Sequence, residues 1–96
     1  MNDGGIEIRQ TSLFIRQKKK FHKGEREVID AAVRGVIRDP RIGEEKRADL
    51  NGVWVHKFRI HRQEYLLAYR WDERVRTFIS VGVHENFYRD VKKYLG

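Results

Sequence analysis

The 96-residue chain contains no cysteine, one proline and one methionine. Without cysteine it forms no disulfides or thiolate metal sites and has no cysteine nucleophile. No apolar run approaches the roughly 20 residues that a membrane-spanning helix needs. The start, MNDGGIEIRQ, lacks the basic segment and apolar core of a signal peptide. We therefore expect a cytoplasmic protein with a single domain over residues 1–96.

Positive charge is what the chain has in excess. It carries 21 Lys and Arg against 14 Asp and Glu, a net charge of +7, and its pI is about 10.0. A small domain of this kind is attracted to polyanions such as nucleic acid, the ribosome or an acidic protein segment. A basic domain with no nucleic-acid role is the alternative. The run RQKKKFHKGER (16–26) favours a solvated helix face that makes long-range phosphate contacts.

Hydrophobic periodicity predicts three helices and four strands. Thr11 and Ser12 can cap the first helix, and Asp39-Pro40 ends the second. From Gly52 onward the apolar period changes from 3.6 to 2. The predicted strands are 6–10, 52–61, 64–71 and 75–82, and the predicted helices are 13–22, 24–40 and 84–95. This order predicts an α+β fold in which an N-terminal strand and a helical hairpin pack on a small twisted antiparallel meander sheet, followed by a C-terminal helix.

A first candidate site is the alternation of Lys57, Arg59 and His61. A spacing of two on a strand directs all three side chains to one face. Because cationic groups repel one another and are costly to bury together, such a face suits solvent and an anion, and a phosphate is the obvious candidate. An ordinary solvated sheet face is the alternative interpretation.

A second candidate site is the pair His84 and Tyr88, four residues apart at the start of the last predicted helix. On a helix they lie side by side. Histidine takes up and releases protons near neutrality, and tyrosine donates or accepts a hydrogen bond. The pair therefore fits proton transfer at a phosphate. The alternative is a helix cap with a tyrosine packed on the sheet.

Other residues favour structural roles. The four histidines lack metal-ligand spacing, and HEN lacks the second histidine of a zinc-binding H-E-x-x-H helix, so we predict no metal site. Trp54 and Trp71 could stack on bases, but their place within strands favours core packing. Gly35 favours close packing of its helix against the sheet.

The landmarks RDPRIGEEKRADLNGVW, EYLLAYRW and FISVG, followed by a basic C-terminal helix, occur in this order over nearly the whole chain. In this the chain resembles the RelE/ParE superfamily of bacterial type II toxin–antitoxin toxins, which implies their fold. RelE-like and YafQ-like members are ribosome-dependent mRNA endonucleases (mRNA interferases) that cut in the A site. ParE-like members instead poison DNA gyrase.

The details of the resemblance differ between the two endonuclease branches. Lys57 and Arg59 match two RelE lysines, but Leu66 replaces the RelE arginine after Tyr65, and His84 replaces a second RelE arginine. The stretch GVHENFY (82–88), which contains His84, is instead similar to the YafQ pattern G-x-H-x-x-x-F. The resemblance to YafQ also points to His61 as a second histidine and to Glu64 in place of an aspartate.

The resemblance implies an RNA cleavage that needs neither metal nor cofactor. Attack by the 2′-hydroxyl requires a base, an acid for the leaving 5′-oxygen and cations for the phosphorane charge. His84 would be the acid or the base, with Tyr88 as its helper or stacking platform. Lys57 and Arg59 would stabilise charge, and His61 would perform the opposite proton transfer.

The resemblance and the charge also imply partners. These are a cognate acidic antitoxin, which we expect to be encoded adjacently, and the ribosome with its mRNA. DNA gyrase is the partner under the alternative function, and a non-catalytic basic binding module is a third interpretation. The basic residues expected to bind RNA or the ribosome are Lys18, Lys19, Lys20, Lys23, Arg62, Lys92 and Lys93.

Overall fold

A computed structural model describes residues 5–95, apart from the side chain of Ala48. The α-helices are α1 (Ser12–Lys19), α2 (Lys23–Arg38) and α3 (His84–Leu95). The strands are β1 (Glu7–Gln10), β2 (Glu44–Glu45), β3 (Trp54–Ile60), β4 (Gln63–Trp71) and β5 (Val75–Gly82). Two short 3-10 turns, Pro40–Ile42 and Ala48–Leu50, flank β2. The predicted α+β fold and its element order are confirmed, with β2 as an addition.

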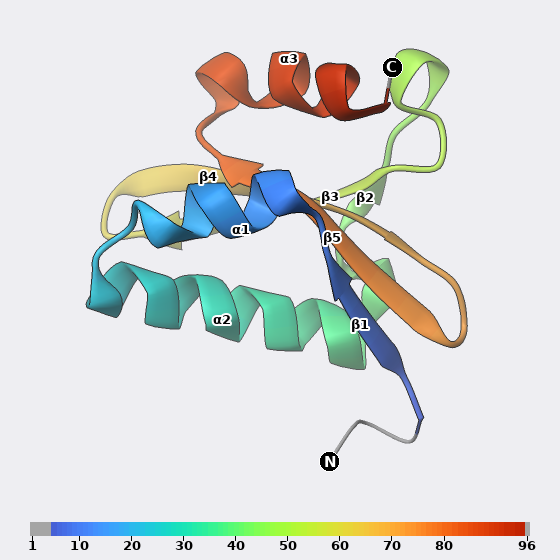
Figure 1. Cartoon of the computed structure of the whole chain (residues 1–96), viewed down its shortest axis with the longest axis horizontal. Coiled ribbons are helices and arrows are strands. Elements are labelled where there is room, and N and C mark those ends of the chain that lie inside the picture. The colour runs from blue at the N-terminus through green and yellow to red at the C-terminus, as the bar shows by residue number, and fades with distance from the viewer. Residues whose placement is uncertain (1–4, 96) are drawn as a thin grey trace.

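The strands form one sheet in the order β1-β5-β4-β3-β2. β3, β4 and β5 make the predicted antiparallel meander, and β2 lies antiparallel on the outer edge of β3. β1 pairs with β5 in parallel, so the sheet is mixed rather than wholly antiparallel. The connection from β1 to the meander runs through the α1–α2 hairpin (Figure 1).

Helices cover both faces of the sheet. On one face, Phe14 of α1 and Ile29 and Val36 of α2 pack on buried residues of β4 and β5. On the other face, Phe87 and Val91 of α3 pack on a second cluster. Burying these fully enclosed side chains contributes about 1.5–3 kcal/mol each. α3 and the α1–α2 hairpin thus belong to opposite layers.

Local hydrogen bonds fix where the elements begin. The Thr11 hydroxyl accepts a hydrogen bond from the Phe14 N–H (3.0 Å) and donates to the Ile79 carbonyl (2.7 Å). It therefore caps α1, as expected, and also ties that helix to β5. Asp39 ends α2 directly before Pro40, in agreement with the prediction.

Tyr69 anchors the segment between α2 and β2. Its buried hydroxyl donates to the Pro40 carbonyl (2.7 Å) and accepts from the Gly43 N–H (3.1 Å). A Cβ at Gly43 would lie 2.6 Å from the Tyr69 hydroxyl and 2.8 Å from the Val55 carbonyl oxygen. The chain therefore needs a glycine to pass this close to the sheet.

Two expectations about single residues are wrong. A Cβ on Gly35 would meet nothing within 4 Å, so this glycine is not required by close helix–sheet packing. His61 does not lie on a strand, because the pair Ile60–Gln63 closes the β3–β4 hairpin and leaves His61 in its two-residue turn. Its φ of 56° lies in the left-handed region.

The two tryptophans pack on the helical-hairpin side, as expected. Trp54 and Trp71 meet edge to face, with ring centroids 5.5 Å apart, and Arg41 lies 4.8 Å from the Trp71 centroid. In the part of the chain described, no helix is long and apolar enough to span a membrane.

Candidate functional site

The centre of the candidate site is the exposed start of α3, next to the end of β5. Gly82, the last residue of β5, pairs with Leu66, which pairs in turn with Lys57 on β3. Since neighbouring strands lie about 4.8 Å apart, the backbones of Lys57 and Gly82 are about 10 Å apart. His84 comes two residues after Gly82 in the chain and begins α3.

Tyr88 contacts His84 edge to face, with ring centroids 5.4 Å apart. The predicted juxtaposition of these two side chains is thereby confirmed. Tyr88 is half-buried and also meets Phe87, at 5.0 Å, against the core under α3. His84 is exposed. The packed ring thus provides a fixed support beside a solvent-accessible imidazole.

Lys46 approaches the same tyrosine from the segment after β2. Its ammonium lies 6.0 Å from the Tyr88 ring centroid and donates to the Glu44 carboxylate at 2.9 Å. This hydrogen bond raises the pKa of Lys46, with a smaller contribution from Tyr88, and lowers the pKa of Glu44. Sequence reasoning missed Lys46 and Glu44, whose only signal is their spacing of two just before Gly52.

Lys57 and Arg59 lie on the face of the sheet that α3 covers further along. Lys57 is paired with Leu66, a member of the core under α3, and directly paired residues share a face. Both cations are exposed, and the Arg59 guanidinium donates to the Arg62 carbonyl (2.7 Å) in the hairpin turn. Lys57 also helps to lower the pKa of Glu44. The two side chains are thus exposed on one face of the sheet, and their binding of an anion stays a prediction.

His61 is not on the face shared by Lys57 and Arg59. It lies exposed in the β3–β4 turn, and over residues 5–95 no side-chain hydrogen bond, ion pair or ring contact joins it to another residue. Glu64, at the start of β4, is paired with Arg59. His61 therefore lies close to Lys57 and Arg59 in the chain, but it does not take part in the contacts that join Tyr88 to His84 and Lys46.

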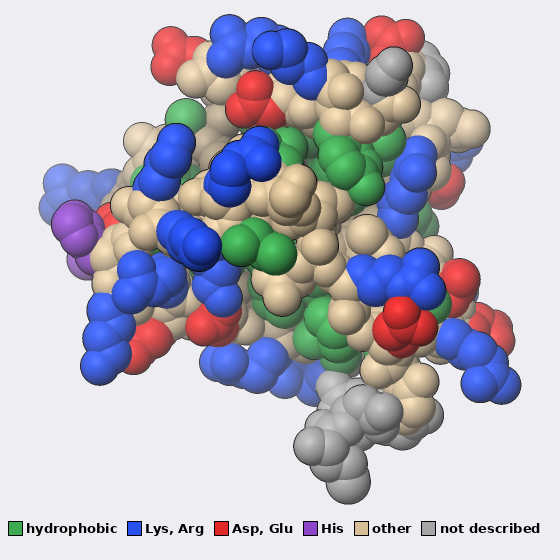
Figure 2. All heavy atoms as spheres, viewed as in Figure 1, with side chains coloured by type: hydrophobic (Ala, Val, Ile, Leu, Met, Phe, Trp, Pro, Cys, Tyr) green, Lys and Arg blue, Asp and Glu red, His purple; other side chains and the backbone are tan. Residues whose placement is uncertain are grey.

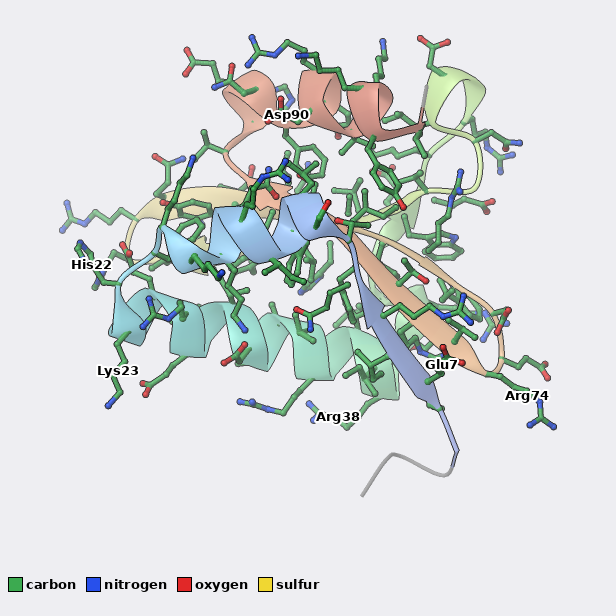
Figure 3. The ribbon with its side chains drawn as sticks, viewed as in Figure 1. Glu7, His22, Lys23, Arg38, Arg74 and Asp90 are labelled. Carbon is green, nitrogen blue, oxygen red and sulfur yellow. The ribbon has the colours of Figure 1, made fainter. Side chains whose placement is uncertain are left out.

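The basic residues expected to bind RNA differ in how freely their charge is displayed. Lys18 is paired with Asp30, and Lys92 with Asp49 at 3.1 Å. Within residues 5–95, Lys20 and Lys93 have no ion pair. Lys19 and Lys23 are likewise exposed and unpaired there, and Lys23 marks the start of α2 in Figure 3. Figure 2 shows Lys and Arg side chains over α1 and along α3.

No group of three or more His, Cys, Asp or Glu side chains suited to a metal occurs among the described residues. The chemistry that this arrangement offers is that of an imidazole, a phenol and several cations. These groups can move a proton and stabilise a developing negative charge.

Comparison with known proteins shows the family. Residues 8–92 match the model of the ParE-like toxin of type II bacterial toxin–antitoxin systems. The chain therefore belongs to the ParE-like toxin family, and the resemblance to the RelE/ParE superfamily is confirmed. No curated protein sequence matches the chain significantly.

Solved structures confirm the fold. A mutant of the E. coli toxin RelE in the free state is 24% identical, with a TM-score of 0.73 over 96% of this chain and 99% of that one. The RelBE2 toxin–antitoxin complex from Mycobacterium tuberculosis contains a chain 23% identical, with a TM-score of 0.69 over 83% and 99%. The YoeB/ParE toxin from Agrobacterium tumefaciens is 19% identical, with a TM-score of 0.67 over 82% and 99%.

Proposed function

We propose that this toxin is a ribosome-dependent mRNA endonuclease that cuts A-site mRNA and so inhibits translation. The observation that carries the proposal is the ring contact between His84 and Tyr88 at the exposed start of α3. Lys46 faces the same tyrosine, and Lys57 lies on the same side of the sheet. An imidazole, a phenol and cations are what metal-free RNA cleavage demands.

The proposed reaction begins when the 2′-oxygen of a ribose attacks the adjacent phosphorus. A base removes the 2′-hydroxyl proton, the bond to the 5′-oxygen breaks, and an acid protonates that oxygen, leaving a 2′,3′-cyclic phosphate and a 5′-hydroxyl. His84 performs one proton transfer beside Tyr88. Lys57 and Arg59 stabilise the phosphorane charge. For the opposite transfer, the exposed His61 stays our candidate.

The ribosome would supply the substrate geometry in this scheme. Lys57, Arg59, His61 and His84 are all exposed, so the protein alone offers little to hold an RNA strand in line. Positioning of reactants is worth several orders of magnitude in rate. We therefore expect the isolated toxin to be close to inert on free RNA.

The partner that restrains the toxin is proposed to be an acidic antitoxin encoded next to it. The net charge of +7 favours an acidic segment, and similar chains occur in the RelBE toxin–antitoxin complexes of E. coli and M. tuberculosis. Co-expression from the native operon should yield a complex. Recovery of the toxin alone would contradict this.

Inhibition of DNA gyrase is the second candidate function, because the matching family model is that of ParE-like toxins. In that case the basic helix α3 would contact gyrase, and His84 would only begin the helix. The two functions therefore differ in their dependence on His84.

Growth arrest on induction separates the two candidates. Under the endonuclease proposal His84→Ala and Lys57→Ala abolish arrest, whereas Arg38→Ala, an exposed cation at the far end of α2, does not (Figure 3). Circular dichroism shows whether each variant is folded, and a supercoiling assay measures gyrase directly. If growth arrest persists in a folded His84→Ala variant and supercoiling is inhibited, the toxin acts on DNA gyrase instead.

A further inference from the structure

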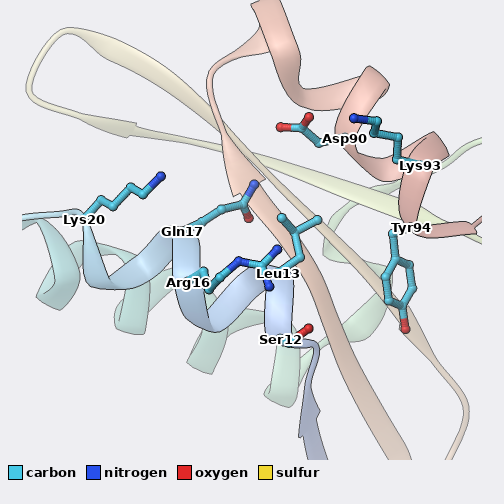
Figure 4. A pocket seen from close by; sticks show the side chains of 8 residues that line it. All are labelled: Ser12, Leu13, Arg16, Gln17, Lys20, Asp90, Lys93 and Tyr94. Atoms are coloured by element: carbon cyan, nitrogen blue, oxygen red, sulfur yellow. The ribbon is translucent and has the colours of Figure 1, made fainter.

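A groove of 490 Å³ runs between α1 and α3 (Figure 4). It lies on the opposite side of α3 from the His84–Tyr88 contact. Asp90 lines the groove, whereas Tyr88 faces Lys46. The two positions differ by two residues, which is about 200° around a helix of 3.6 residues per turn. The groove is therefore distinct from the candidate reaction site.

Three cations surround this groove. Arg16 comes from α1, Lys20 is the residue that caps the C-terminal end of α1, and Lys93 comes from α3. None of them has an ion pair within residues 5–95. The one acidic residue in the lining is Asp90, which lies 3.7 Å from Arg89. The groove thus presents a net positive charge.

The floor of the groove offers a hydrogen-bond donor. The Gln17 side-chain oxygen accepts from the Val81 N–H (2.8 Å) and from the Ser80 hydroxyl (3.2 Å). Because a backbone N–H can only donate, the oxygen must face β5, and the amide nitrogen then faces α3. Figure 4 shows it turned that way. Over residues 5–95 that nitrogen has no hydrogen-bond acceptor.

Apolar surface completes the lining. Tyr94 of α3 is 48% exposed, and its ring lies at one end of the groove near Leu13 of α1. Figure 2 shows apolar side chains between the two helices, surrounded by Lys and Arg. An exposed aromatic ring among cations is the arrangement that binds single-stranded nucleic acid by stacking.

We propose that the α1–α3 groove binds a short segment of single-stranded RNA. Its phosphates contact Arg16, Lys20 and Lys93, and a base stacks on Tyr94. Gln17 donates to a base edge and Asp90 accepts from one. This inference rests on the proposed action of the toxin on mRNA, and it adds a second RNA contact on the far side of α3.

An acidic peptide is the competing occupant for such a groove. The lining favours RNA, because the Asp90 carboxylate can accept hydrogen bonds from base amino groups, and acidic side chains have no such donor. The free amide of Gln17 likewise suits the carbonyl and ring-nitrogen acceptors of bases.

The test is fluorescence anisotropy of a labelled single-stranded RNA of about ten nucleotides with the full-length His84→Ala protein, which leaves the probe intact. Lys93→Glu and Lys20→Glu should each weaken binding about tenfold or more. Each should also reduce the slope of log affinity against log salt by about 0.7 per lost phosphate contact. Tyr94→Ala should weaken binding at least about fivefold, the lower end of base–aromatic stacking.

Arg38→Glu is the matched control, since it makes the same charge change on α2, away from the groove. It should weaken binding less than about threefold, through long-range charge alone. Equal losses in Arg38→Glu and Lys93→Glu would overturn the proposal. So would stronger competition by a double-stranded RNA or by a poly-glutamate peptide than by unlabelled single-stranded RNA.

The test distinguishes a failure of this inference from a failure of the proposed function. If the groove variants bind RNA normally but His84→Ala abolishes cleavage on ribosomes, the groove proposal fails and the endonuclease stands. If the groove binds as described but the ribosome assay shows no cleavage, the endonuclease fails and the RNA site stands.

Discussion

Tyr88 has three neighbours, two from its own helix α3 and one from the segment after β2. His84 and Phe87 meet its ring at 5.4 and 5.0 Å, and the Lys46 ammonium lies 6.0 Å from its centroid. Glu44 in turn holds Lys46 through a hydrogen bond of 2.9 Å. The tyrosine is thus confined on several sides, and we assign Lys46 the role of positioning it.

Replacing Lys46 by methionine tests this role. The variant keeps the aliphatic stem and loses the ammonium, so the fold should persist while the phenol becomes less well placed. We expect kcat of ribosome-dependent cleavage to fall about tenfold or more, with KM nearly unchanged. Lys46→Arg should restore much of the loss. A methionine variant with normal kcat would remove Lys46 from the mechanism.

His56 gives a pH dependence of stability. Its ring packs beside Phe58, with ring centroids 6.3 Å apart. Burial there lowers the pKa of His56 below the ordinary value of 6.5. Between the lowered folded pKa and 6.5 the unfolded chain binds more protons, so the free energy of unfolding rises with pH. This contribution is present above pH 6.5 and is lost as the pH falls toward the folded pKa.

Urea unfolding between pH 5 and 7.5 measures the effect. Wild type should lose stability toward pH 5 more steeply than His56→Gln, which cannot titrate at this position. His22→Gln is the control, since that imidazole is exposed. If the free energy of unfolding depended on pH in the same way in wild type and in His56→Gln, His56 would not be the source of the pH dependence.

Sequence periodicity placed some site residues and missed others. His84 and Tyr88 could be paired because they are four residues apart on one helix, where spacing alone fixes contact. Lys46 could not be placed, since its contact with Tyr88 joins elements about forty residues apart in the chain. His61 was misplaced, because its two-residue turn lacks the Asn-Gly or Asp-Gly signal that would end the strand earlier.

At the level of elements, the sheet is less predictable than its strands. The bounds of β5 and α3 follow directly from alternation and from helical spacing. The parallel pairing of β1 with β5 joins segments some seventy residues apart, which no local pattern encodes. β2 has only two residues, too few to show a period. The mixed sheet therefore appears only in the structure.

Two glycines should respond in opposite ways to alanine. Gly35 lies within α2, where a Cβ would meet nothing within 4 Å, so Gly35→Ala should stabilise the protein by about 0.5–1 kcal/mol. At Gly43 a Cβ would lie 2.6 Å from the Tyr69 hydroxyl, so Gly43→Ala should destabilise it by about 1–3 kcal/mol. Shifts of the urea midpoint report both. Destabilisation by Gly35→Ala would mean that α2 packs more closely than described.

On the scale of the whole molecule, α3 separates the two surfaces for which we propose contacts with RNA. One side of this helix carries His84 and Tyr88 near Lys46, and the other carries Lys93 and Tyr94 opposite α1. A strand of mRNA cut at the first surface could be held at the second. The excess of positive charge over the molecule suits both contacts.

The family could be predicted from the sequence, but the activity could not. The order of landmarks over nearly the whole chain was enough to indicate the superfamily, and residues 8–92 match the model of one of its families. Cleavage and gyrase binding can share one fold, since function depends on the site grafted onto it. His84, Tyr88 and Lys57 are the residues whose role decides between them.

The most direct test of the account is in vitro translation of a defined mRNA with added toxin, followed by primer extension to locate the new 3′ ends. We predict cuts within the A-site codon that disappear with His84→Ala and persist with His22→Ala. A supercoiling assay on the same preparation should show active gyrase. Intact mRNA together with inhibited supercoiling would contradict the account and assign the toxin to gyrase.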